Sequence, residues 1–185
     1  MNTKPTSLFA LFDAARMGVA MTDAKERFPE RFATLYRGES AKNLADFAPY
    51  LFWFDAADST LKDWFPANGW GKSWGVFLRS RTSVEELYRH FRRYLIIADE
   101  TGRELYFRFY DPRVLREFLL TCTSTQLTEF FGPVQQFFME DEDPNFSLCF
   151  WLEAGQLNCR RVNKEVDSEF AFLTSPSPAG NTPLF

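Results

Sequence analysis

Hydrophobic and polar side chains alternate along residues 104–110 and then change their spacing. One side of the alternation is apolar and the other carries tyrosine and arginine: Leu105, Phe107 and Phe109 against Tyr106, Arg108 and Tyr110. A period of two predicts a β-strand with two distinct faces. From residue 112 onward the apolar side chains recur at helical spacing instead, which predicts an α-helix with an apolar stripe of Val114, Leu115, Phe118 and Leu119.

The residues at this change of period are suited to start a helix. Asp111 can accept hydrogen bonds from the free N–H groups of a helix N-terminus, and Pro112 fits the first helical position, where its missing N–H is not needed. A strand is therefore expected to pass into a capped helix with almost no loop. Arg108 and Arg113 flank this junction among apolar neighbours, so we expect at least one of them to belong to a half-buried polar network.

Other apolar runs predict the remaining strands of a sheet. The runs at 50–55 and 74–79 do not alternate, which is typical of strands covered on both faces. Shorter runs predict strands at 8–12 and 134–139. Two hairpins complete the set. The first joins strands at 95–98 and 105–110 through a turn at 99–103. The second joins strands at 146–152 and 157–162 through a turn at Ala154-Gly155.

The clearest helix signal follows Ser83. Ser83 and Glu86 have the spacing of a capping box, and apolar residues at helical spacing continue from Val84 to Leu95. A further short helix is predicted to start at Ser124 or Thr125 and to end near Gly132-Pro133. Shorter helical segments are expected at 31–36, where Gly38 would close the helix, at 44–47 and at 61–65.

These elements predict an α/β fold, with α+β as the alternative: a single lobe in which short helices flank a mixed β-sheet. The expected organisation has four parts. Residues 1–7 form a flexible N-terminus, 8–138 a domain, 139–173 a C-terminal extension with the second hairpin, and 174–185 a disordered proline-rich tail.

Composition narrows the class of function. Aromatic residues make up 18% of the 185 residues, with 22 Phe, and most of them are expected in a Phe-rich core with some at partner surfaces. The formal net charge of −4 disfavours binding to nucleic acid, which needs a basic field. No apolar run approaches the ~20 residues of a membrane span, and no secretory signal is present. We interpret the cysteines as reduced, buried thiols of a cytoplasmic protein: Cys122, Cys149 and Cys159.

Few residues suggest catalysis. His90 is the only histidine, and it lies on the helix after Ser83 within a local basic cluster of Arg79, Arg81, Arg89, Arg92 and Arg93. A neutral His90 could act as a general base, but a structural role in hydrogen bonding is favoured. Gly71-Lys72-Ser73 ends like a phosphate-binding loop, yet Pro66 occupies the position of the first glycine. We therefore expect no cofactor, no metal and no catalytic residues.

Several segments together resemble one protein family. These segments are Trp74–Arg81, Leu87–Arg93, Phe107–Leu115 and Phe130–Val134, in this order and at natural spacing. They look like the adaptor chaperones of bacterial type VI secretion, which carry a domain long labelled as of unknown function. The resemblance covers roughly residues 8–138.

The resemblance implies a cytoplasmic, non-enzymatic protein that binds a toxin effector. Such adaptors help to place the effector on the spike tip, which is a spike trimer with or without its cone-shaped cap. The family fold implied is an α/β lobe that is often followed by a helical C-terminal lobe. Here the chain after Phe138 is too short for that lobe, so a second adaptor protein could complete the grip on the cargo.

The sequence therefore predicts an adaptor that binds protein through an aromatic surface. The residues expected near this surface are Trp53, Tyr106, Arg108, Tyr110 and Arg113. A second set is expected to have structural roles: Ser83, His90, Asp111, Pro112, Gly132 and Pro133. Two alternatives stay open, a small hydrolase or phosphate-binding enzyme that uses His90 and the arginine cluster, and an immunity or regulatory partner that neutralises a toxin.

Overall fold

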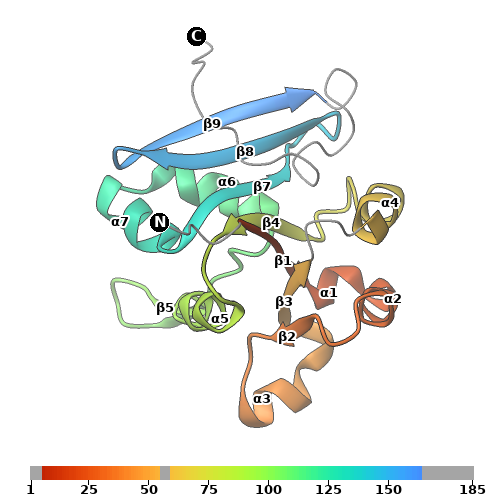
Figure 1. The fold of residues 1–185 in the computed structure, drawn as a ribbon. Helices are drawn as coiled ribbons and strands as arrows, with labels where there is room; N and C mark the ends of the chain where they lie inside the picture. Colours follow the sequence, from red (N-terminus) through yellow and green to blue (C-terminus); the bar gives the residue numbers. More distant parts are fainter. Residues whose placement is uncertain (1–5, 55–58, 164–185) are drawn as a thin grey trace.

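A seven-stranded β-sheet organises the chain, with strand order β2-β3-β1-β4-β7-β8-β9 (Figure 1). The computed structural model describes residues 6–54 and 59–163. The strands of the sheet are β1 (Ser7–Asp13), β2 (Phe32–Thr34), β3 (Pro49–Phe54), β4 (Gly75–Ser80), β7 (Val134–Glu140), β8 (Phe146–Glu153) and β9 (Gln156–Asn163).

The α/β class and the single sheet with flanking short helices are confirmed, but the sheet is antiparallel where a mixed one was expected. Each pairing between its described strands is antiparallel. The reason is that each strand begins beside the end of its neighbour in the sheet. Asp13 at the end of β1 lies opposite Pro49 at the start of β3, and Ser80 at the end of β4 lies opposite Val134 at the start of β7.

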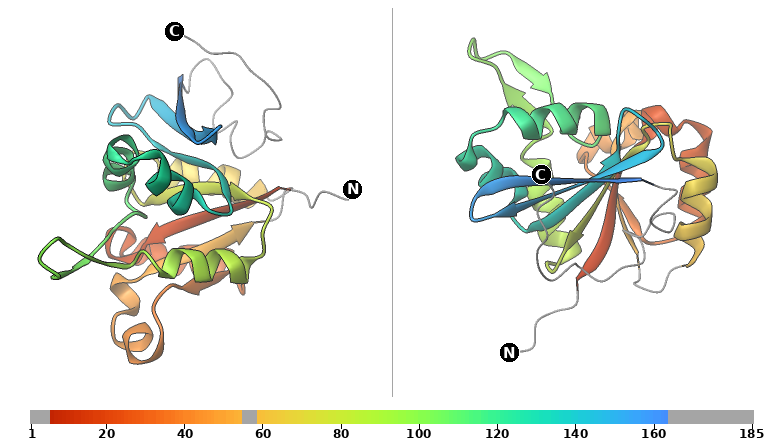
Figure 2. Two further views of the ribbon diagram at one scale, coloured as in Figure 1. Left: turned by 90° about the vertical axis from the view of Figure 1, so that its left-hand side faces the viewer. Right: turned by 90° about the horizontal axis from the view of Figure 1, so that it is seen from above.

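Helices cover both faces of the sheet (Figure 2). One face packs against α1 (Ala14–Met17), α2 (Val19–Arg27) and α4 (Ser59–Asn68). The opposite face packs against α5 (Val84–Arg92), α6 (Pro112–Thr121) and α7 (Ser124–Phe131). Between β2 and β3 the chain forms α3 (Gly38–Asn43) and the short 3₁₀ helix η1 (Ala45–Phe47), and between α5 and α6 it forms the two-stranded hairpin of β5 (Ile96–Ala98) and β6 (Glu104–Tyr106).

Burial on both faces explains why the strand sequences are apolar without alternation. In β1, Phe9 and Leu11 belong to the core on the α5–α7 side, whereas Ala10 and Phe12 belong to the core on the α1–α4 side. Among the twelve largest side chains that are fully buried, ten are phenylalanines. The aromatic surplus of the sequence is therefore mainly core, as the composition predicted.

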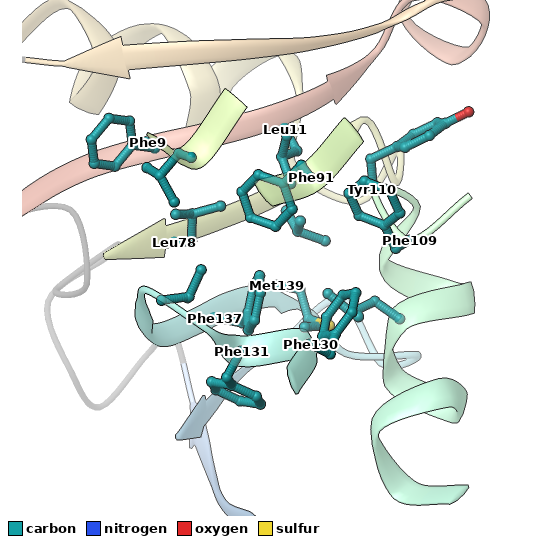
Figure 3. Packing of buried hydrophobic residues seen from close by; sticks show 14 of the residues in the cluster. Phe9, Leu11, Leu78, Phe91, Phe109, Tyr110, Phe130, Phe131, Phe137 and Met139 are labelled. Atoms are coloured by element: carbon teal, nitrogen blue, oxygen red, sulfur yellow. The ribbon is translucent and has the colours of Figure 1, made fainter. Parts of the chain in front are cut away.

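Stacked rings connect the helices on the α5–α7 side to the sheet (Figure 3). The ring of Phe91 on α5 stacks on Phe109, with centroids 5.5 Å apart. The ring of Phe130 on α7 stacks on Phe137 of β7 at 5.7 Å. Phe109 precedes α6 directly, so this cluster fixes the strand-to-helix segment with which the sequence analysis began.

That segment is shorter as a strand than predicted. β6 ends at Tyr106, and residues 107–110 are irregular. Phe109 and Tyr110 are both buried, at 0% and 5% exposure, and two consecutive buried side chains do not fit a strand with one solvated face. Residues 107–110 instead cross the edge of the core, and Phe107 and Phe109 anchor the helices rather than the sheet.

Two further predictions of local structure were wrong. The helix expected at 31–36 is the strand β2, which pairs with β3 at Phe52 and Tyr50, while the helix of this region lies earlier, at Val19–Arg27. Phe32 of β2 packs against Phe52 of β3, so tertiary contacts override a weak helical pattern. Helix α7 is capped by Thr123 in a capping box with Gln126, one residue before the predicted start.

Most other predicted elements are present, but α1 and α3 were not predicted, and Gly38 begins α3 instead of closing a helix. Ser83 caps α5 in the predicted capping box, and both hairpins are present, the second of them as β8 and β9 in the main sheet. Cys149 is buried, but Cys159 is exposed because it lies on the outermost strand, so three buried thiols were a wrong expectation. The tail at 174–185 and residues 1–5 lie outside the described residues. In the part of the chain that the structure describes, no helix is both long enough and apolar enough to cross a membrane.

Candidate functional site

Two buried aspartates meet at the point where β1 ends and α6 begins. Asp111 is 1% exposed and caps α6 by accepting a hydrogen bond from the backbone N–H of Arg113 at 3.0 Å. Its carboxylate also accepts from Nε of Arg113 at 3.0 Å and from Nη2 at 2.6 Å. Pro112 occupies the first helical turn as predicted. The guanidinium of Arg113 therefore binds the same carboxylate that caps the helix, and Arg113 stabilises the start of its own helix.

Asp13 makes the same arrangement over a long sequence distance. It is 1% exposed and caps α1 by accepting from the backbone N–H of Ala15 at 3.0 Å. Its second carboxylate oxygen pairs with Nη2 of Arg108. Arg108 thus ties the segment before α6 to the end of β1, an interior strand of the sheet. We call Asp13, Arg108, Asp111 and Arg113 the junction cluster.

The charges of the junction cluster shift the pKa values of its members and neighbours. Burial works to raise the pKa of Asp111, but the hydrogen bonds and charge of Arg113 outweigh it, so the pKa lies below the usual range. Burial, followed by the negative charge of Asp13, raises the pKa of Tyr110. Burial, followed by interactions with Tyr106 and Asp13, also raises the pKa of Tyr36. Asp111 is therefore charged and both tyrosines are neutral at pH 7.

The five residues predicted for the protein-binding surface do not form one patch. Tyr106 is 66% exposed, and the side chains of Arg108 and Arg113 are 43% and 51% exposed although both are paired. Tyr110 is buried. Trp53 lies opposite Phe9, four residues along β1 from Asp13, which places it about 13 Å from the junction cluster along the sheet.

An exposed apolar surface lies beside the junction cluster, on the β5–β6 hairpin. All six of its strand residues are exposed, and in Figure 2 the hairpin projects from the body of the protein. Four of the eight exposed large hydrophobic side chains in the described chain lie on it, at 38–66% exposure: Ile96, Ile97, Leu105 and Tyr106. We call these four residues the hairpin patch. Sequence analysis identified only Tyr106, because the alternation of the strand predicted that one face of the hairpin would be buried.

His90 is buried, and both of its ring nitrogens have partners within the protein. It is 4% exposed; its Nε2 lies 2.7 Å from the carbonyl oxygen of Phe130, and its Nδ1 lies 2.7 Å from Nη2 of Arg93. Nε2–H therefore donates to the carbonyl and Nδ1 accepts from the guanidinium. Burial lowers the pKa of His90, and the charge of Arg93 lowers it further, against the opposing effect of the Phe130 carbonyl. Both ring nitrogens of a neutral imidazole are thus engaged by the protein.

Gly132 is required for this contact. Its φ is +47°, and a Cβ added there would lie 2.4 Å from Cε1 of His90. The next residue, Pro133, accepts a hydrogen bond from the hydroxyl of Ser80 at 2.7 Å. Gly132 and Pro133 therefore join the end of α7 to α5 and β4, which is the structural role predicted for them.

The predicted arginine cluster does not act as one site. Arg89 and Arg93 line a surface depression with His90 and Glu86. Arg92 instead donates to the carbonyl of Leu35 at 2.8 Å. Arg79 is buried and lies over the ring of Phe138, at 5.4 Å from its centroid. The local density of arginines in sequence is thus divided among three different surroundings.

Comparison with known families identifies the domain. Residues 8–129 match the family described as Domain of unknown function (DUF4123), which is well over half of the chain. The chain belongs to this family. The DUF4123 match includes the junction cluster and the hairpin patch, and it ends within α7, before the strands β7, β8 and β9 that complete the sheet. Neither the comparison with curated proteins nor that with solved structures gave a match.

Sequence reasoning missed Asp13 and Tyr36 as members of the site. A signal for Asp13 was present, since an aspartate directly after the apolar run at 8–12 and before two alanines is suited to cap a helix. No local signal marks Tyr36, which reaches the junction cluster only because β2 lies beside β3.

Proposed function

We propose that this DUF4123 protein is an adaptor that binds a toxin effector and assists its loading onto the spike tip of a type VI secretion system. The proposal starts from the resemblance of residues 74–81, 87–93, 107–115 and 130–134 to such adaptors. The observation that carries it is the hairpin patch, an exposed apolar surface of a size that is often functional in monomeric proteins.

The division of roles at the junction supports binding rather than catalysis. The carboxylates of the junction cluster are buried and each is paired with an arginine. They cap helices, so their oxygens are occupied by the fold. The imidazole of His90 is likewise held between Phe130 and Arg93. The polar groups considered for a hydrolase thus already have structural partners.

Reconstitution with defined partners tests the proposal. The purified chain is mixed with the effector and with the spike protein encoded in the same gene cluster, and complexes are separated by size-exclusion chromatography. We expect a stable complex with the effector, and deletion of the adaptor gene should stop secretion of that effector while secretion of other effectors continues. Failure to bind either protein, together with unchanged secretion, would reject the proposal.

A toxicity assay separates loading from neutralisation. The effector is produced in a cell that lacks the secretion system, with and without this chain. An adaptor leaves the toxicity of the folded effector largely intact and is needed for its export. Full protection from the toxin with no effect on export would identify an immunity protein instead.

A further inference from the structure

The hairpin patch is built as a preformed element. At its base, Leu95 and Phe107 are buried in the core, and the N–H of Phe107 donates to the carbonyl of Leu95 at 3.1 Å. The first residues beyond this base are already exposed. The pair Ile96 and Tyr106 lies directly opposite in the ladder, and Ile97 lies opposite Leu105 on the other face. Apolar side chains therefore occupy both faces of a two-stranded blade.

The tip of the hairpin is held in shape by Asp99. One of its carboxylate oxygens accepts from the N–H and hydroxyl of Thr101 and from the N–H of Arg103. The other accepts from Nε of Arg103 at 3.1 Å. Gly102 takes a φ of +82° to close the turn, and its N–H donates to the Asp99 carbonyl at 2.9 Å. A two-stranded hairpin is marginal in water, so this hydrogen bonding at the exposed tip keeps the blade formed before any partner binds.

Charge at the tip indicates the kind of surface that receives it. The hairpin loop and strand ends carry three carboxylates, at Asp99, Glu100 and Glu104, against one guanidinium at Arg103. Asp99 is paired with Arg103, whereas no residue in the described part of the chain forms an ion pair with Glu100 or Glu104. The blade is therefore apolar along its strands and acidic at its tip.

We propose that the hairpin patch inserts as a blade into an apolar groove of the effector whose rim is basic. This inference rests on the proposed adaptor function and assigns the binding element within it. Insertion of a preformed element loses little conformational entropy, so a small apolar area can supply much of the affinity.

A second copy of the chain fits the patch less well than such a groove. Four side chains that are each exposed by 38–66% offer roughly 300–400 Å² of apolar surface, which is below the about 800 Å² that each partner buries in a standard stable interface. Two hairpins that met side by side in parallel orientation would also bring their acidic tips together.

A double variant of the patch gives the main test. Ile96→Thr/Tyr106→Thr removes the apolar pair next to the base of the hairpin but keeps β-forming side chains. The matched control is Phe47→Ser/Leu120→Ser, which removes two side chains that are 64% and 65% exposed and are not part of the hairpin. Binding of the purified effector from the same gene cluster is measured by biolayer interferometry. We expect at least a ten-fold rise in Kd for the hairpin variant and less than a three-fold change for the control.

Two further variants test shape and charge. Asp99→Ala loosens the tip while it leaves the patch side chains in place, and it should raise Kd several-fold through loss of the preformed turn. Glu100→Lys/Glu104→Lys should slow association at low salt, and this difference should disappear at about 1 M salt, where the Debye length is only ~3 Å. Faster association of the lysine variant would contradict a basic rim.

The outcomes distinguish this inference from the proposed function. If the double hairpin variant binds the effector as tightly as the wild type, the inference is overturned and the adaptor function is kept. If the double hairpin variant loses binding to the spike protein but still binds the effector, the blade binds the spike protein and the proposed effector groove is wrong. A dimer of the wild-type chain that the double variant dissociates, measured by analytical ultracentrifugation, assigns the patch to self-association. Wild-type protein that binds neither effector nor spike removes the adaptor function and the inference together.

Discussion

The junction cluster and the hairpin patch lie next to each other in sequence but have opposite surroundings. At the junction, two carboxylates are buried, paired with arginines and used as helix caps. On the hairpin, apolar side chains are exposed on both faces. Tyr106 and Arg108 are two residues apart and mark the change from one to the other. The difference indicates that the polar residues of this region stabilise the fold, whereas its apolar residues are available for binding.

The largest expected effect comes from removing a buried cap. Asp111→Ala deletes the cap of α6 and the partner of Arg113, and we expect it to lower the free energy of unfolding by about 2–4 kcal/mol. Urea denaturation measures the loss. Asp111→Asn keeps an acceptor for the helix N–H groups and should recover part of it. The control Glu117→Ala, at an exposed position of the same helix, should change stability by less than about 0.5 kcal/mol, and an equal loss in both variants would contradict a structural junction.

The next largest effect on stability distinguishes Arg108 from Arg113. Arg108→Ala leaves the carboxylate of Asp13 buried without its ion-pair partner, and we expect a loss of about 1–3 kcal/mol in unfolding free energy. Arg113→Ala should cost less, because Asp111 still accepts the backbone N–H of residue 113. Thermal denaturation and effector binding are measured on the same samples. Arg108→Ala should reduce stability at least as much as binding, and an unchanged melting temperature with lost binding would reverse the roles of the two regions.

A pH dependence of the unfolding free energy is expected from His90. Its pKa in the folded protein is lowered by burial, while in the unfolded chain it has the usual value near 6.5. Below that pH the unfolded state binds the proton first, so stability is present above pH 6.5 and is lost as the pH falls toward the folded pKa. Unfolding free energies at pH 7.5 and 5 should differ more for the wild type than for His90→Gln, and equal differences would show that the imidazole is not buried in its neutral form.

The smallest effect on stability is expected on the hairpin. Ile96→Thr should change the unfolding free energy by less than about 0.5 kcal/mol, because the side chain is 48% exposed and its replacement keeps a β-branched residue. The neighbouring Leu95→Ala, at a position 8% exposed, should cost about 2–3 kcal/mol. Similar losses at both positions would mean that the hairpin packs against the body, and the contrast between the two regions would fail.

Local sequence signals determined the parts of the fold that depend on neighbouring residues. The capping box at Ser83, the helix start at Asp111-Pro112 and the turn at Ala154-Gly155 were predicted because caps and turns are formed by side chains a few positions apart. The same reasoning placed Arg108 and Arg113 at a polar network. It could not find the partner of Arg108, because Asp13 is 95 residues away in the chain.

The tertiary structure decided which of these residues are buried and which are exposed. Alternation placed Tyr106, Arg108 and Tyr110 on one face, but β6 ends at Tyr106 and Tyr110 then enters the core. It also left open whether the hairpin would pack against the body, and only the fold shows that it projects from it (Figure 2). The sequence by itself therefore determined the start of α6 and the family of the domain, since both depend on local patterns. The separation of a stabilising junction from an exposed apolar blade depends on long-range packing, which the order of residues alone does not specify.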